Sequence, residues 1–147
     1  MHLAVELGTL PGWVGLGAAL NVGRGPLVIF AGAYVAASLF LSPDLDLERS
    51  SAAYRWRKAR VLWKPYAALF RHRGISHSPV WGPLTRILYL GGLAALGWAL
   101  LNAATRAPPP RSLPWESALP ILAGVYLPHL LHVALDRVTT WGRRPVR

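Results

Sequence analysis

The chain has 147 residues, of which 53% are hydrophobic, and it carries a formal net charge of +10 at pH 7 and no cysteine. That length suits one domain, so we expect residues 1–147 to form a single unit, and the lack of cysteine excludes a disulfide framework and a thiolate metal site. The basic excess fits either a nucleic-acid-binding protein or a membrane protein with arginine-rich cytoplasmic loops.

Four apolar stretches follow one another along the chain, at residues 3–22, 26–41, 87–104 and 117–135. Glu6 interrupts the first, whereas the second and third contain no charge. The third stretch is close to the ~20 residues that a bilayer-spanning helix needs, and it lacks the polar stripe of a soluble amphipathic helix. We therefore predict an all-α fold, a small multi-spanning membrane bundle of about four helices with a basic segment between the second and third.

Basic residues are unevenly divided between the predicted loops. Arg24, Arg106 and Arg111 lie in two short loops, and the other basic residues lie in the segment 42–86 or in the C-terminal tail. Because basic loops stay on the cytoplasmic side, this distribution predicts a multi-pass inner-membrane (cytoplasmic membrane) protein with both termini in the cytoplasm. Membrane lipid is the first expected partner.

Residues 53–70 mix Lys and Arg with aromatic side chains. Such a segment can lie against anionic lipid headgroups, or it can stack its aromatic rings on nucleic-acid bases. A third possibility is a plain cytoplasmic basic loop with an aromatic belt. We favour this or lipid contact, and we do not expect nucleic acid as a partner. The aromatic residues are Tyr54, Trp56, Trp63, Tyr66 and Phe70.

Two aspartates follow the second apolar stretch, in the sequence Ser42-Pro43-Asp44-Leu45-Asp46. Pro43 disfavours helical backbone in the residue before it, so the helix should end there. In extended backbone, residues i and i+2 point to the same side, and both carboxylates would then face one point. The alternative is an ordinary turn with a helix-capping aspartate.

Two histidines, His72 and His77, flank Gly74 in the basic segment. Gly74 is expected to end a short helix, and Pro79 should keep the next segment from continuing it. Imidazoles on either side of such a turn can converge on one metal ion. The alternative is a pair of solvated loop histidines near phosphates or lipid.

The fourth apolar stretch carries His129, His132 and Asp136. Spacings of three and four residues place all three on one face of a helix. Ionisable groups inside a membrane segment are costly and usually line a site, although a polar seam against a neighbouring helix is the alternative. His129 lies one turn further from the helix end, so we expect it to support the site rather than bind metal.

The predicted topology brings these groups, together with His2, to the same membrane face. Imidazole and carboxylate ligands favour zinc, with manganese or iron as alternatives. The candidates outnumber the four ligands of a tetrahedral zinc, so we expect one or two divalent ions, and two-metal sites clamp phosphate oxygens. The candidate metal ligands are His2, Asp44, Asp46, His72, His77, His132 and Asp136.

The motif order resembles that of known families. Pro43-Asp44-x-Asp46, then His72-Arg73-Gly74-x-Ser76-His77-Ser78, then His132-x-x-x-Asp136 resembles a family of inner-membrane metal-dependent hydrolases with LexA-regulated members. Residues 41–90 resemble still more closely an uncharacterised family of metal-binding membrane proteins, through Pro65-Tyr66 and an Arg-x-x-Tyr-Leu ending. The resemblance implies a distant tie to helical zinc-dependent phospholipase C and related nucleases. It also implies a histidine in the first helix, and His2 is the candidate.

Three functions remain open. The first is a metal-dependent hydrolase that acts on a phosphoester or lipid-linked substrate at the cytoplasmic face, where Asp46 and His72 act as base or orienting groups and Arg73, with Arg71, stabilises developing negative charge. The second is a non-enzymatic membrane protein with a structural metal ion. The third is a membrane-tethered module that binds nucleic acid or a protein partner.

Overall fold

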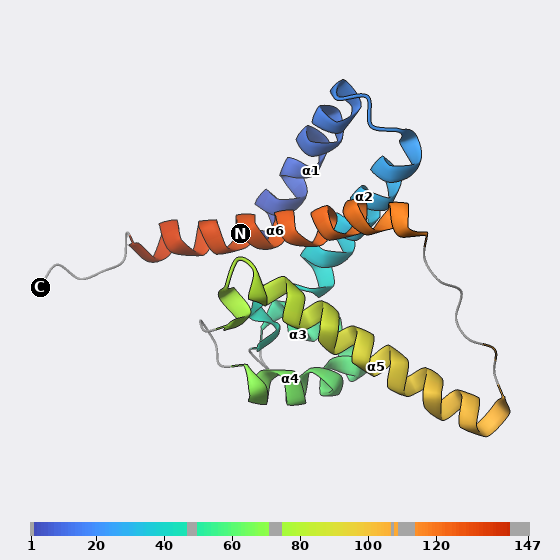
Figure 1. The fold of residues 1–147 in the computed structure, drawn as a ribbon. Coiled ribbons are helices and arrows are strands. Elements are labelled where there is room, and N and C mark those ends of the chain that lie inside the picture. Colours follow the sequence, from blue (N-terminus) through green and yellow to red (C-terminus); the bar gives the residue numbers. More distant parts are fainter. Residues whose placement is uncertain (1, 47–49, 71–74, 107, 109–113, 142–147) are drawn as a thin grey trace, which may run out of the picture.

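The computed structural model describes residues 2–46, 50–70, 75–106, 108 and 114–141. Within these ranges the chain forms six α-helices and four 3-10 helices and contains no strand (Figure 1). This confirms the predicted all-α class. The helices outnumber the expected four because the basic segment forms short helices of its own.

Each of the four apolar stretches forms a long helix. These helices are α1 (His2–Ala19), α2 (Arg24–Phe40), α5 (Trp81–Thr105) and α6 (Ala118–Trp141). The shorter elements are η1 (Pro43–Asp46), α3 (Ser51–Arg55), η2 (Arg57–Trp63), α4 (Lys64–Leu69), η3 (Ile75–His77) and η4 (Trp115–Ser117).

Helices α2 and α6 are in close contact at Gly124. A Cβ atom on Gly124 would lie 2.7 Å from the Ala33 Cβ atom and 2.7 Å from the Phe30 carbonyl oxygen. Real side chains do not approach backbone this closely, so only glycine lets the two helices pack at this distance. The contact fixes α6 against α2, and α6 carries two of the candidate metal ligands.

Helix α1 is attached to the same pair of helices through a buried tyrosine. The Tyr34 hydroxyl donates to the Glu6 carbonyl oxygen at 3.1 Å and lies 2.9 Å from the Thr9 hydroxyl. Because this contact is at Glu6, it positions the first turns of α1 beside α6. In Figure 1, α1 and α2 form a hairpin against α6, while α5 points away from the three.

Two segments, 81–105 and 115–139, are long and apolar enough to cross a membrane by length and composition. Among the described residues, α1 and α2 do not meet the same criterion, so the four predicted spans are reduced to two qualifying helices. The two also differ in their surroundings. None of the most apolar part of residues 81–105 is buried, whereas 33% of the most apolar part of residues 115–139 is buried.

The basic segment between α2 and α5 builds a small core from its aromatic residues. Trp63 and Tyr66 are 2% and 0% exposed and pack with Leu45. These two rings therefore pack inside the protein and are not free to contact lipid headgroups, and burial of their large aromatic surfaces holds this segment together. Tyr54 is exposed and differs from them, with the Arg60 guanidinium 5.3 Å from its ring centre.

Candidate metal centre

Five of the candidate ligands meet at one place, although they come from four separate segments. His2 lies in the first turn of α1, Asp44 in η1 and His77 in η3, and α6 supplies His132 and Asp136. They form two groups of three that share His132, and in each group the potential ligand atoms lie within 4.8 Å of one another. We call these five residues the His/Asp cluster.

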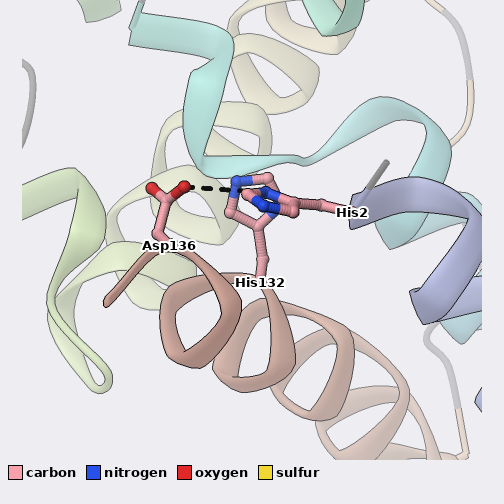
Figure 2. A group of neighbouring side chains, drawn as sticks. All are labelled: His2, His132 and Asp136. Atoms are coloured by element: carbon pink, nitrogen blue, oxygen red, sulfur yellow. Dashed lines mark ion pairs between the residues drawn. The ribbon is translucent and has the colours of Figure 1, made fainter. Parts of the chain in front are cut away.

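The first group joins α1 to α6. Figure 2 shows the side chains of His2, His132 and Asp136 pointing toward one another. The His2 Nδ1 atom lies 3.6 Å from Asp136 Oδ1, and the ring centres of His2 and His132 are 4.9 Å apart. Because His132 and Asp136 are one helical turn apart, α6 presents both to His2 from the same face.

The second group joins the two irregular segments to α6. The Nε2 atom of His77 lies 4.0 Å from Asp44 Oδ1 and 3.4 Å from Asp136 Oδ2. The Nε2 atom of His132 lies 3.6 Å from Asp44 Oδ2. Asp44 and Asp136 therefore each contact imidazoles from two different segments, which makes the five residues one continuous cluster.

Glu6 fixes the orientation of the central histidine. Its carboxylate is buried, with the residue 3% exposed, and Oε1 lies 2.8 Å from His132 Nδ1. A carboxylate can only accept, so Nδ1 carries a proton and donates it, which leaves Nε2 as the nitrogen that a metal ion could bind. Metal-binding histidines usually have a partner of this kind on their second nitrogen.

The residues present fit a divalent cation. The Nε2 atom of His132 is buried and makes no hydrogen bond within the part of the chain that the structure describes, although Asp44 Oδ2 lies 3.6 Å away. A buried nitrogen in that state is costly unless a ligand satisfies it. The surrounding carboxylates of Glu6, Asp44 and Asp136 contribute negative charge, and the imidazole and carboxylate donors match zinc, manganese or iron better than copper(I).

The backbone around Asp44 differs from the predicted extended form. Residues 43–46 form η1, and the Asp44 amide lies 3.4 Å from the Ser42 hydroxyl. The extended backbone from which we argued that Asp44 and Asp46 share a side was therefore wrong, whereas the role of Asp46 as a ligand stays a prediction. Pro43 does end α2, as expected, since that helix stops at Phe40.

Several predicted residues fall outside the described part of the structure. His72, Arg73 and Arg71 belong to residues 71–74, and Gly74, the expected helix end, lies there too. The backbone of Asp46 is described but its side chain is not. The roles assigned to these residues stay predictions.

His129 points to a different set of partners from His132. Its Nε2 atom donates to the Ser78 carbonyl oxygen at 2.9 Å, and its Nδ1 atom accepts from Arg86 at 3.2 Å. The same Arg86 nitrogen donates to the Leu41 carbonyl oxygen at 3.0 Å. Ser78 follows His77 and Leu41 precedes η1, so Arg86 and His129 hold together the two segments that carry His77 and Asp44.

Sequence reasoning missed Glu6 and misjudged Arg86. Glu6 was treated as an interruption of an apolar stretch, although it lies one helical turn after His2 and therefore on the same face. Arg86 was counted among the basic residues of a cytoplasmic loop, yet it is 1% exposed and lies inside the protein. Each of these two residues is a single charge in a largely apolar stretch, and this is the sequence signal that could have identified them as buried.

A family model described as "Uncharacterized metal-binding protein (DUF2227)" matches residues 1–145. The chain belongs to this metal-binding family. An uncharacterised protein of Aquifex aeolicus (strain VF5) is 35% identical over 126 residues, covering 76% of this chain and 89% of that protein. No solved structure matches the chain. Membership in this family confirms the predicted resemblance to an uncharacterised metal-binding family, whereas the link to LexA-regulated hydrolases stays a prediction.

Proposed function

We propose that the His/Asp cluster holds one divalent metal ion, most favourably zinc. His132 Nε2, His77, Asp44 and Asp136 would be the ligands, and His2 offers a fifth donor. Both groups of three share His132, and Glu6 engages its Nδ1 atom. Only one nitrogen of His132 is then left for metal, which favours one ion over the two that the number of candidate ligands allowed.

We further propose that the protein is a metal-dependent hydrolase of phosphoesters. The observation that carries this proposal is a cavity of about 430 Å³ whose lining includes His2, Asp44 and His132. A purely structural ion is enclosed by protein ligands and needs no such space, whereas a catalytic ion keeps one position accessible. A divalent ion here would supply Lewis-acid activation of water and of a phosphoryl oxygen.

The protein's own residues would contribute orientation. Glu6 holds the His132 ring and its tautomer, so that Nε2 stays available as a ligand. Arg86 and His129 fix the spacing between the segments that carry Asp44 and His77. Asp46, His72 and Arg73 are retained as candidates for proton transfer and charge stabilisation.

The same proposal places the protein in the inner membrane as a multi-pass protein with both termini cytoplasmic. The exposed apolar surface of α5 supports it, because leucines such as Leu88, Leu96 and Leu100 would be covered by lipid. The cluster is built from the start of α1, the segment after α2, the segment before α5 and the C-terminal half of α6. These positions match one face of an up-and-down arrangement, and a substrate with a lipid anchor could reach that face.

The test combines metal analysis with turnover. Purified protein should contain about one equivalent of zinc, following from one shared His132 nitrogen, and should hydrolyse a member of a panel of phosphomonoesters, phosphodiesters and phospholipids. His132→Ala should lose the metal, and Asp44→Asn should lose turnover. Glu116→Gln is the matched control, since Glu116 is an exposed acid in η4, and it should change neither.

Two results would overturn parts of this proposal. Full metal content in His132→Ala and Asp136→Asn would remove the His/Asp cluster as the binding site. A zinc-loaded protein with no turnover on any member of the panel, and with every coordination position filled by protein, would establish a structural ion.

A further inference from the structure

The cavity beside the His/Asp cluster has a second polar surface that the metal does not need. Part of its lining comes from the cluster and from Glu6. The other polar residues that line it are Ser38, Ser42, Ser51 and Arg55, which we call the serine–arginine wall. These four residues come from α2, the turn after it and α3, so α2 and the basic segment build this wall together.

Ser38 contributes a buried hydroxyl group to this wall. The residue is 2% exposed, and its hydroxyl has no hydrogen-bond partner among the described residues. Buried hydroxyl groups are nearly always paired, because leaving them unpaired costs free energy. A hydroxyl that faces a cavity without a protein partner can donate to an acceptor atom of a bound molecule.

Arg55 supplies a fixed positive charge on the same wall. One guanidinium nitrogen, NH1, donates to the Leu39 carbonyl oxygen at 2.9 Å, which holds the half-buried side chain against the end of α2. A guanidinium has five N–H donors, so most remain available as far as the described residues are concerned. Its planar fork matches the oxygens of a phosphate group in a two-pronged contact.

The charge on the cluster makes this arginine important for an anionic ligand. Glu6 and Asp44 line the cavity as carboxylates, and they repel an approaching anion. A cation fixed in the same cavity offsets that repulsion at the place where an anion would sit. Among the residues that line the cavity, Arg55 is the one that supplies this positive charge.

We infer that the serine–arginine wall is the subsite for the phosphate group of the substrate, with Arg55 and the Ser38 hydroxyl as its donors. The inference deepens the proposed function and rests on it, since the metal ion would lie in the same cavity. Arg55 adds a further candidate for charge stabilisation to Arg71 and Arg73, which the sequence suggested. The phosphate can belong to a soluble ester or to a lipid headgroup.

The test measures phosphate binding separately from turnover. Protein loaded with Mn²⁺ is titrated with inorganic phosphate, and ³¹P line broadening reports whether the phosphate lies near the metal. Arg55→Gln should weaken binding about ten- to hundred-fold, as expected for loss of charge-assisted hydrogen bonds, with Mn²⁺ content unchanged. Ser38→Ala should weaken it about three- to ten-fold and leave the fold intact, because it removes a hydroxyl without a protein partner.

Matched variants and a second probe complete the design. Arg60→Gln removes an exposed arginine that lines a different cavity, and it should bind phosphate like the wild type. Arg55→Lys keeps the charge but loses the fork, so its affinity should fall between those of wild type and Arg55→Gln. Dihexanoyl phosphatidate is titrated in parallel, and the probe that binds more tightly identifies a lipid or a soluble source.

The outcomes separate this inference from the proposed function. Phosphate binding that depends on Arg55 supports the inference even if the protein shows no turnover. Equal binding by wild type and Arg55→Gln, or no broadening by Mn²⁺ in the wild type, overturns it even if the protein is a hydrolase. Failure of the wild type to bind Mn²⁺ or zinc would instead overturn the metal centre itself.

Discussion

The two longest helices, α5 and α6, have similar length and apolar composition, but they have different surroundings. Helix α6 packs on α2 through Gly124 and carries buried His129 and His132. The most apolar part of α5 has no buried residue. The buried residues of this helix lie in its first turns, and the last of them is Arg86. Hydrophobicity therefore does not tell whether a helix is covered by protein or by lipid, and the polar residues it carries are more informative.

The largest change in stability is expected when the hydrogen bond between Arg86 of α5 and His129 of α6 is removed. Arg86→Met should lower the free energy of unfolding by about 3 kcal/mol, because the Leu41 carbonyl and His129 lose a charged donor. Chemical denaturation of the detergent-solubilised protein measures this change. Arg24→Met removes an exposed arginine and should be neutral. Wild-type stability in Arg86→Met would mean that the first turns of α5 are held by apolar contacts alone.

Alanine substitutions at one glycine of α6 and one glycine of α5 should change the stability of the protein in opposite directions. Gly124→Ala should cost about 1–3 kcal/mol, since the new Cβ atom would overpack the contact with Ala33 and Phe30. Gly97→Ala in α5 meets no atom within 4 Å and should stabilise the helix by up to about 1 kcal/mol. Thermal unfolding of both variants under the same conditions gives the comparison. A loss of stability in Gly97→Ala would show that this face of α5 contacts protein.

The smallest effect is expected on the outer part of α5. Leu96→Ala should change the free energy of unfolding by less than about 0.5 kcal/mol, because Leu96 is exposed and detergent or lipid would cover it. Denaturation of the purified variant and retention in the membrane pellet after a carbonate wash are the measurements. Release of the wild type by salt alone would contradict the membrane proposal, and a large loss of stability would indicate a second protein surface against α5.

The sequence predicts the helices and the cluster better than it predicts their surroundings. Apolar stretches locate α1, α2, α5 and α6 because each is long and bounded by polar residues. The spacing of His132 and Asp136 predicts a shared helical face, and the motif order selects Asp44 and His77. Glu6 could not be assigned in the same way, since its partner, His132, is 126 positions away in the sequence.

Other features depend on tertiary packing that no local pattern encodes. Trp63 and Tyr66 follow the same basic-aromatic pattern as the exposed Tyr54, and only the fold separates buried from exposed rings. Residues 43–46 form a 3-10 helix in place of the predicted extended backbone, and Asp44 joins the cluster from this tight turn. The sequence does not predict the direction of α5 either, because its apolar stretch has no polar face that would orient the helix against the others.

The contact between Glu6 and His132 also has a consequence for biosynthesis. These residues are 126 positions apart in the sequence, so Glu6 cannot orient the histidine until α6 has formed and packed beside α1. Contacts of such large sequence separation form late in folding. The ion would then bind only after α6 has packed beside α1, and by binding that state alone it would stabilise it over less folded intermediates. Metal retention would thus report that these two helices have come together.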